Sequence, residues 1–135
     1  MTTPKIILVR VTPNQAERMD KFIFMEKMYS GRPDFVVESC RHFLSKYDYM
    51  VKSTTDSEEY KQEGPIGRNS LLQDAKEKFF FEVGRKQEST KNRIIINARV
   101  PKGLFDKIFR ISKGSIQSIF SMALDLYISD LEGSP

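Results

Sequence analysis

Apolar and polar positions alternate along the first third of the chain in a way that predicts one strand and two helices. Residues 5–11 are a short β-branched and aliphatic run, long enough for one strand. Thr12 and Gln15 have the spacing of a capping box, with Pro13 between them at a favoured first helical position. Apolar residues then recur at helical spacing, which predicts helices at about 13–29 and 33–47.

The same order of elements recurs near the other end of the chain. Residues 93–100 are typical of a strand, Pro101 begins a short helix, and Ser115 caps a final helix that runs to about residue 131. A strand–helix–helix pattern that occurs twice indicates an internal repeat. Val11 and Ser39 are 28 positions apart, whereas Val100 and Ala123 are 23 apart, so the first helix of the second copy should be about a turn shorter.

The segment between the copies is polar at both ends. Residues 52–66 are rich in Ser, Thr, Asp, Glu, Lys, Gly and Pro, which favours a linker. A capping-box pattern at Ser70 predicts a helix over about 70–83, closed by Gly84. We therefore expect a mainly α protein with short β ribbons. A first unit at 1–51 and a second at 92–135 would be joined by a partly helical linker at 52–91.

The second predicted strand carries polar residues on one face only. Side chains alternate across a strand, so Ile94, Ile96, Ala98 and Val100 form an apolar face. The opposite face carries Arg93, Ile95, Asn97 and Arg99. The first strand is more apolar, with Ile6, Leu8 and Arg10 on its outer face. Arg10 and Arg99 match, because each comes just before a helix.

The repeat resembles the ribbon-helix-helix (Arc/MetJ/CopG-like) DNA-binding family, in which two strands pair into a ribbon and two helices follow each strand. In the first unit the likeness lies in the second helix, at Asp34, Phe35, Val36, Glu38, Arg41 and Leu44. In the second unit it lies at Ser115, Ile119, Phe120, Ala123 and Leu124. Tandem copies in one chain are similar to certain plasmid-transfer proteins and archaeal or archaeal-virus regulators.

The resemblance implies a sequence-specific regulator of transcription that binds double-stranded DNA. The ribbon would enter the major groove, where Arg can pair with guanine, Asn with adenine, and an apolar side chain with the thymine methyl. The residues implied as base readers are Arg93, Ile95, Asn97, Arg99, Arg10 and Leu8. Helix starts offer N–H groups to phosphate, which implies backbone contacts from Ser115, Lys113 and Arg32.

The net charge of the chain agrees with a polyanionic partner. Its composition argues against disulfide, zinc and catalytic sites. The net charge is +4, and the excess is +2 in residues 1–51 and +2 in 92–135, with balance between them. One cysteine, Cys40, and one histidine, His42, exclude an internal disulfide and a usual zinc site. We find no phosphate loop or nucleophile–base pair, so we expect neither an enzyme nor a cofactor.

Without an apolar run of 18 residues or a secretory pattern, we expect no membrane partner and a cytoplasmic location, in the host cytoplasm if the source is a virus. Cys40 should lie in the core and His42 at the surface. Three adjacent aromatics, Phe79, Phe80 and Phe81, point about 100° apart around a helix, so some of them must meet a second surface.

Two matters remain open from the sequence. A lone strand needs a partner, so the two units pair within one chain or like units pair between two chains, with possible further assembly on DNA. The alternative function is a protein–protein interaction module, such as an antitoxin-like or adaptor protein. The apolar outer face of the first strand favours that alternative.

Overall fold

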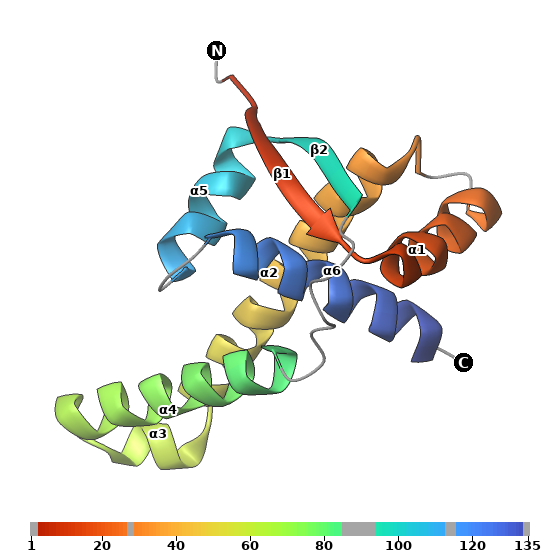
Figure 1. The fold of residues 1–135 in the computed structure, drawn as a ribbon. Helices are drawn as coiled ribbons and strands as arrows, with labels where there is room; N and C mark the ends of the chain where they lie inside the picture. Colours follow the sequence, from red (N-terminus) through yellow and green to blue (C-terminus); the bar gives the residue numbers. More distant parts are fainter. Residues whose placement is uncertain (1–2, 27–28, 85–93, 113–115, 134–135) are drawn as a thin grey trace.

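A computed structural model describes residues 3–26, 29–84, 94–112 and 116–133, and in this part of the chain it shows six helices and one small sheet. The elements in chain order are β1 (Lys5–Val11), α1 (Pro13–Met25), α2 (Arg32–Thr55), α3 (Glu58–Gln62), α4 (Pro65–Gly84), β2 (Ile94–Val100), α5 (Lys102–Ile111) and α6 (Ile116–Gly133). The protein is thus mainly helical, with one two-stranded antiparallel sheet. The predicted order of strand, helix and helix is seen at both ends of the chain (Figure 1).

The two strands, far apart in sequence, pair with each other in the same chain. Their antiparallel register places Lys5 opposite Val100, Leu8 opposite Asn97 and Val11 opposite Ile94. Of the two pairings that the sequence left open, the structure therefore has the one within the chain. The ribbon lies across one end of the molecule, and α3 and α4 lie at the opposite end (Figure 1).

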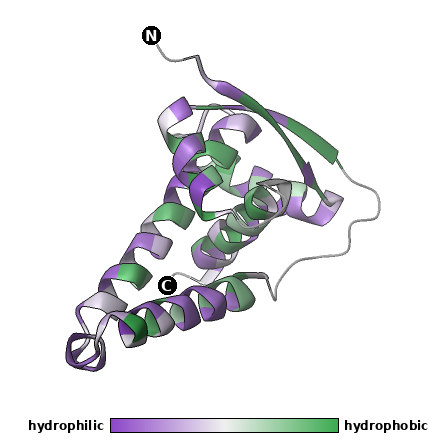
Figure 2. Cartoon of the chain, turned by 90° about the vertical axis from the view of Figure 1, so that its left-hand side faces the viewer, coloured by the Kyte–Doolittle hydropathy of each residue, from purple (hydrophilic) through white to green (hydrophobic). Residues whose placement is uncertain are grey.

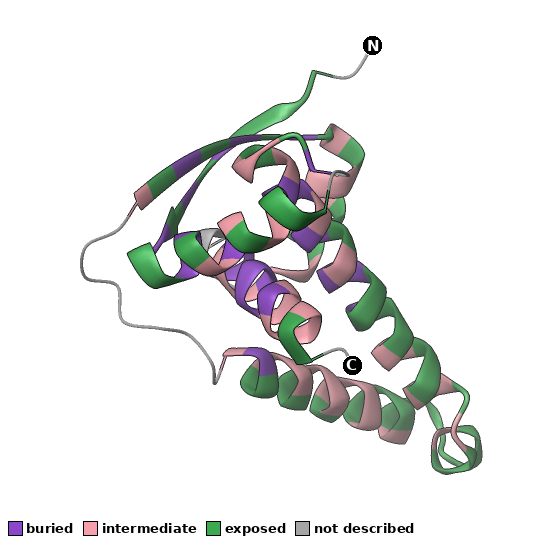
Figure 3. Cartoon of the chain, turned by 90° about the vertical axis from the view of Figure 1, so that its right-hand side faces the viewer, coloured by how far each residue is buried: buried purple, intermediate pink, exposed green. Residues whose placement is uncertain are grey.

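The predicted alternation of the strands is confirmed by their burial. Six inward side chains of the ribbon are at most 8% exposed. They are Ile7, Val9, Val11, Ile96, Ala98 and Val100. They lie over α2 and α6, which supply most of the rest of the core, and burial is concentrated there (Figure 3). Buried residues of these two helices include Phe35, Val36, Cys40, Phe43, Phe120, Ala123, Leu124 and Ile128. Burial of such side chains is the main favourable term in folding.

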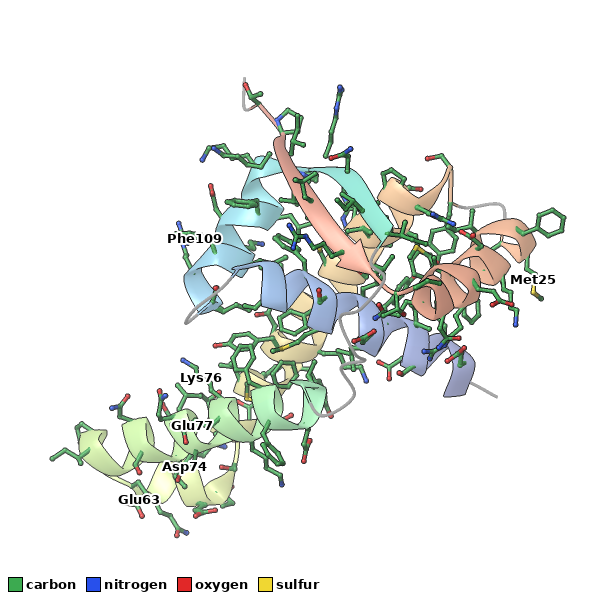
Figure 4. The ribbon with its side chains drawn as sticks, in the orientation of Figure 1. Met25, Glu63, Asp74, Lys76, Glu77 and Phe109 are labelled. Atoms are coloured by element: carbon green, nitrogen blue, oxygen red, sulfur yellow. The ribbon has the colours of Figure 1, made fainter. Side chains whose placement is uncertain are left out.

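Helix α1 begins as the sequence predicts and ends earlier. The Thr12 hydroxyl accepts a hydrogen bond from the Gln15 amide at 3.1 Å, and Oε1 of Gln15 accepts one from the Thr12 amide at 2.8 Å. The helix ends at Met25, a turn before the expected residue 29. Met25, in the last turn, is 75% exposed and points away from the body of the molecule (Figure 4).

Helix α2 runs two turns beyond its predicted end at Tyr47, and helices occupy most of residues 52–66, where the composition predicts a linker. Thr55 ends α2, and Ser57 caps α3 by accepting a hydrogen bond from the Tyr60 amide at 3.2 Å. Arg68 then donates to the carbonyl oxygens of Tyr60 and Lys61, both at 3.1 Å, which satisfies the end of α3. Short-range hydrogen bonds thus form helices in this polar segment.

Helix α4 begins at Pro65 rather than at Ser70, which lies inside it. Proline suits a first helical position, and that signal outweighs the capping-box pattern five residues later. The helix packs along α2 through aromatic side chains. The Phe79 ring lies 5.6 Å from the Phe43 ring and 5.7 Å from the Tyr47 ring.

The three adjacent phenylalanines of α4 divide as their angular spacing predicts. Phe80 also contacts Phe43, with ring centroids 6.2 Å apart, whereas Phe81 is 69% exposed. The second surface that the sequence required is the C-terminal half of α2. Apolar and polar residues are correspondingly mixed around α4 in Figure 2.

Helix α6 is joined to the N-terminal half of the chain by polar contacts that the sequence did not indicate. Gln15 donates a side-chain hydrogen bond to the buried carboxylate of Asp125, and Arg18 forms an ion pair with Glu132. His42 was expected at the surface, but it is partly buried, and its Nε2 donates to Oδ2 of Asp130 at 2.6 Å. Asp130 also lies 3.3 Å from Nζ of Lys46.

Helix α5 has 10 residues, three fewer than the 13 of α1, as the spacing comparison predicts. Its Ile108 is fully buried, and Leu104, Phe105 and Ile111 pack against the core. Phe109 faces away from the body, where Figure 4 shows it at the outer side of the helix.

Candidate nucleic-acid interface

The side of the ribbon that faces away from the helices is the candidate site, and we call it the outer ribbon face. It consists of Ile6, Leu8, Arg10, Ile95, Asn97 and Arg99, all of them exposed. Alternation along each strand forces these residues outward once the opposite side chains enter the core. The packing of Val9 and Ala98 over the helices thus decides which way Arg10, Asn97 and Arg99 point.

Strand pairing arranges the six side chains in three rows across the ribbon. Ile6 lies opposite Arg99, Leu8 opposite Asn97, and Arg10 opposite Ile95. The two arginines therefore occupy diagonal corners of the face. Four residues separate the first and last rows along a strand, a rise of roughly 13 Å.

The polar groups of the outer ribbon face are available for a partner. Among the described residues, Arg10, Asn97 and Arg99 make no side-chain hydrogen bond or ion pair. Two guanidinium groups and an amide are therefore presented together on a backbone held by the ladder and the core. Such a face can donate to acceptors on a rigid, extended surface without first breaking internal contacts.

The predicted phosphate contact at Arg32 lies elsewhere and already has a protein partner. Its Nε and Nη2 donate to the two carboxylate oxygens of Asp20 at 2.9 and 2.7 Å. These hydrogen bonds hold the pKa of Asp20 below its ordinary value, although burial opposes the shift. Arg32 thus joins α1 to α2, and any phosphate would compete with a bidentate carboxylate. The sequence could not show this contact, because Asp20 and Arg32 belong to different helices.

Three other predicted site residues lie outside the described residues. They are Arg93, which precedes β2, and Lys113 and Ser115, which precede α6. The described part of the predicted base-reading set comprises Leu8, Arg10, Ile95, Asn97 and Arg99, and the ribbon brings all five onto one face. Ile6, which the sequence places on the outer face of the first strand, is the most exposed apolar residue of the outer ribbon face, at 69%. Its alternation with Ile7 is the signal that indicates it.

A hollow of about 660 Å³ lies between α2, α4 and α6, bordered by Tyr49, Met50, Phe79 and Leu126. It is far from the ribbon, and Lys46, Lys78 and Glu82 are the charged residues at its rim. Among the described residues, no three His, Cys, Asp or Glu side chains gather as a metal site would require.

Fold and site together define a class: a small, mainly helical protein that exposes one face of a two-stranded antiparallel ribbon. Comparison of the chain with family models, with characterised proteins and with solved structures gives no match. Within the part of the chain that the structure describes, none of the helices combines the length and the apolar character needed to cross a bilayer.

Proposed function

We propose that the protein binds double-stranded DNA sequence-specifically, with the outer ribbon face in the major groove, and regulates transcription. The observation that carries the proposal is the presentation of Arg10, Asn97 and Arg99 on one face of an antiparallel ribbon. The major groove accommodates a two-stranded ribbon, and each base pair displays a distinct set of donors and acceptors there. In this reading, residues 1–51 and 92–135 are two ribbon-helix-helix units whose strands pair within one chain.

The chemistry of the three polar side chains supports a base-reading role. An arginine can donate two hydrogen bonds to O6 and N7 of guanine, and an asparagine can pair with N6 and N7 of adenine. Each such pair contributes about 1–3 kcal/mol of discrimination against a wrong base. Ile6, Leu8 and Ile95 lie among these groups, where apolar side chains can contact thymine methyl groups.

The test is selection of bound sequences from a random double-stranded DNA pool with the full chain. We expect enrichment of one short motif, and an affinity for it that falls as salt concentration rises, because phosphate contacts release counterions. The matched control is the triple variant Arg10→Ala, Asn97→Ala, Arg99→Ala, which leaves the inward faces of both strands intact. A folded wild-type protein that enriches no motif would overturn the proposal.

A second candidate function uses the same face for a protein partner. Ile6, Leu8 and Ile95 are 69%, 45% and 56% exposed, which is a large apolar share for a solvent-facing surface. An antitoxin-like or adaptor protein would bury them against its partner. Binding to a protein that Ile6→Asp and Ile95→Asp abolish, with no DNA binding by the wild type, would favour this second function.

A further inference from the structure

The outer ribbon face has an internal two-fold relation that becomes visible only with the strand register. Directly opposite residues of an antiparallel pair are related by a local two-fold axis perpendicular to the sheet. Here one such axis passes between Leu8 and Asn97, the central row of the face. It exchanges Arg10 with Arg99 and Ile6 with Ile95, so each residue of the first and last rows is exchanged with a residue of the same type.

The central row is the one place on this face where the relation fails. The axis exchanges Leu8 with Asn97, an apolar side chain with an amide. On the inward face the axis exchanges Ile7 with Ile96 and Val11 with Val100, which are the same residue types, whereas it exchanges Val9 with Ala98. Four outward positions are thus symmetric, and a single pair at the centre differs between the two halves.

B-DNA has two-fold axes of its own, and proteins with two-fold symmetry bind sites with matching symmetry. We infer that the DNA site is an imperfect palindrome, with outer positions read identically in both halves by Arg10 and Arg99, and with a central position read differently by Asn97 and Leu8. This inference rests on the proposed function and adds the form of its target. The central row would determine the orientation of the protein on its site.

The geometry limits the spacing of the symmetric contacts. Arg10 and Arg99 start from rows about 13 Å apart, which corresponds to about four base pairs when the ribbon lies along the groove. The expected wild-type motif therefore has guanines related by two-fold symmetry about this distance apart. Between them, one half requires adenine opposite Asn97, and the other half lacks that requirement because a leucine cannot make the amide pair.

Two single variants test the inference by making the face fully symmetric. Leu8→Asn places an amide in both halves, and Asn97→Leu places an apolar side chain in both. Neither residue enters the core, so both variants should unfold at the wild-type denaturant concentration. In the random-pool selection, Leu8→Asn should give a palindrome with adenine in both halves, and Asn97→Leu a palindrome without the adenine requirement. Binding of the original motif by Asn97→Leu should fall roughly 5- to 150-fold.

A swap of the two central residues supplies the third variant and a readout besides affinity. The double variant Leu8→Asn, Asn97→Leu should select the wild-type motif from a double-stranded pool but bind it in the opposite orientation. A DNA-cleaving reagent attached through Thr3→Cys, at the exposed start of the ribbon, reports that orientation. Cys40, the one natural cysteine, is buried and should remain unlabelled in the folded protein.

The expected result is cleavage in one half of the site with the wild-type face and in the other half with the swapped face. A wild-type motif whose outer positions are unrelated by two-fold symmetry would overturn the inference, as would a perfectly palindromic centre. Cleavage that stays in the same half after the swap would also overturn it. In each of these outcomes a motif is still selected, so the proposed function stands. A pool without enrichment would overturn the proposed function, and the inference with it.

Discussion

Arg99 shows how a single side chain acquires a role from its strand. The residues on either side of it, Ala98 and Val100, are fully buried, so the guanidinium must point to solvent. An exposed arginine without a hydrogen bond or ion pair contributes little to stability, but it is available to a ligand. The same reasoning holds for Asn97, whose neighbours Ile96 and Ala98 are buried.

We therefore predict that Arg99→Ala and Asn97→Ala weaken binding to the selected DNA motif and relax the choice of base, each by about 1–3 kcal/mol of discrimination. The unfolding midpoint should change little, because neither side chain contributes to the core. Fluorescence anisotropy with matched and mismatched duplexes measures the first effect, and thermal denaturation the second. Lys78→Ala, which removes a positive charge from α4 at the other end of the molecule, is the control. Unfolding caused by Arg99→Ala would show that its side chain is structural.

Cys40 is a second residue whose behaviour follows from its surroundings. Its side chain is fully buried in α2, and burial raises the pKa of the thiol to about 12, against smaller opposing effects of Ser39 and Arg41. The thiolate is the reactive form of cysteine. We predict that a thiol reagent at pH 8 leaves the native protein unmodified and labels it fully in denaturant. Mass spectrometry distinguishes the two, and rapid labelling of the folded chain would contradict the buried placement.

Helix α4 is held in place by packing against a neighbouring helix. Its aromatic side chains Phe79 and Phe80 meet α2 at Phe43 and Tyr47. Most helical stability in proteins comes from such tertiary packing rather than from intrinsic propensity. The docking of α4 on α2 therefore stabilises both helices.

Adjacent residues of α4 provide a matched test of this packing. Phe79→Ala should lower the free energy of unfolding by about 2 kcal/mol, because it removes a partly buried ring that contacts Phe43 and Tyr47. Phe81→Ala makes the same chemical change at an exposed position and should alter the free energy of unfolding by less than about 0.5 kcal/mol. Urea denaturation followed by circular dichroism measures both. Equal effects of the two substitutions would mean that α4 does not dock through this face.

For the molecule as a whole, the C-terminal helix α6 holds the fold together. It packs beneath β1 and along α2, and its carboxylates pair with α1 and α2. Asp130 lies between His42 and Lys46. Burial opposes its ionisation, but the hydrogen bond from His42 and the charge of Lys46 outweigh that effect and hold the pKa of Asp130 below its ordinary value.

A depressed carboxyl pKa implies stability that depends on pH. The contribution of Asp130 is fully present above the pKa of the unfolded chain, about 3.9, and is lost as pH falls through the lower pKa of the folded state. We predict that Asp130→Asn destabilises the protein more at pH 7 than at pH 2. Asp74→Asn, at an exposed position on α4 (Figure 4), is the control and should show a much smaller pH-dependent difference. Chemical denaturation across this pH range measures both. A constant difference for Asp130→Asn would contradict the ion-pair role.

The sequence by itself determined the local features of this protein. The alternation in residues 94–100, the capping box at Thr12 and the shorter α5 depend on neighbours within a few positions, so periodicity and side-chain chemistry were sufficient to predict them. The exposed positions of Arg10, Asn97 and Arg99 followed from the same alternation. The helical character of 52–66 was missed, because a polar composition resembles that of a linker.

The tertiary structure alone decided which distant groups meet. It paired β1 with β2 in a register centred on Leu8 and Asn97, bound Arg32 to Asp20, and placed Asp130 between His42 and Lys46. Local propensity contains no information on these contacts, because each depends on how whole elements pack over a shared core. The symmetry of the outer ribbon face belongs to this second group, since it exists only between two strands that the chain brings together from opposite ends.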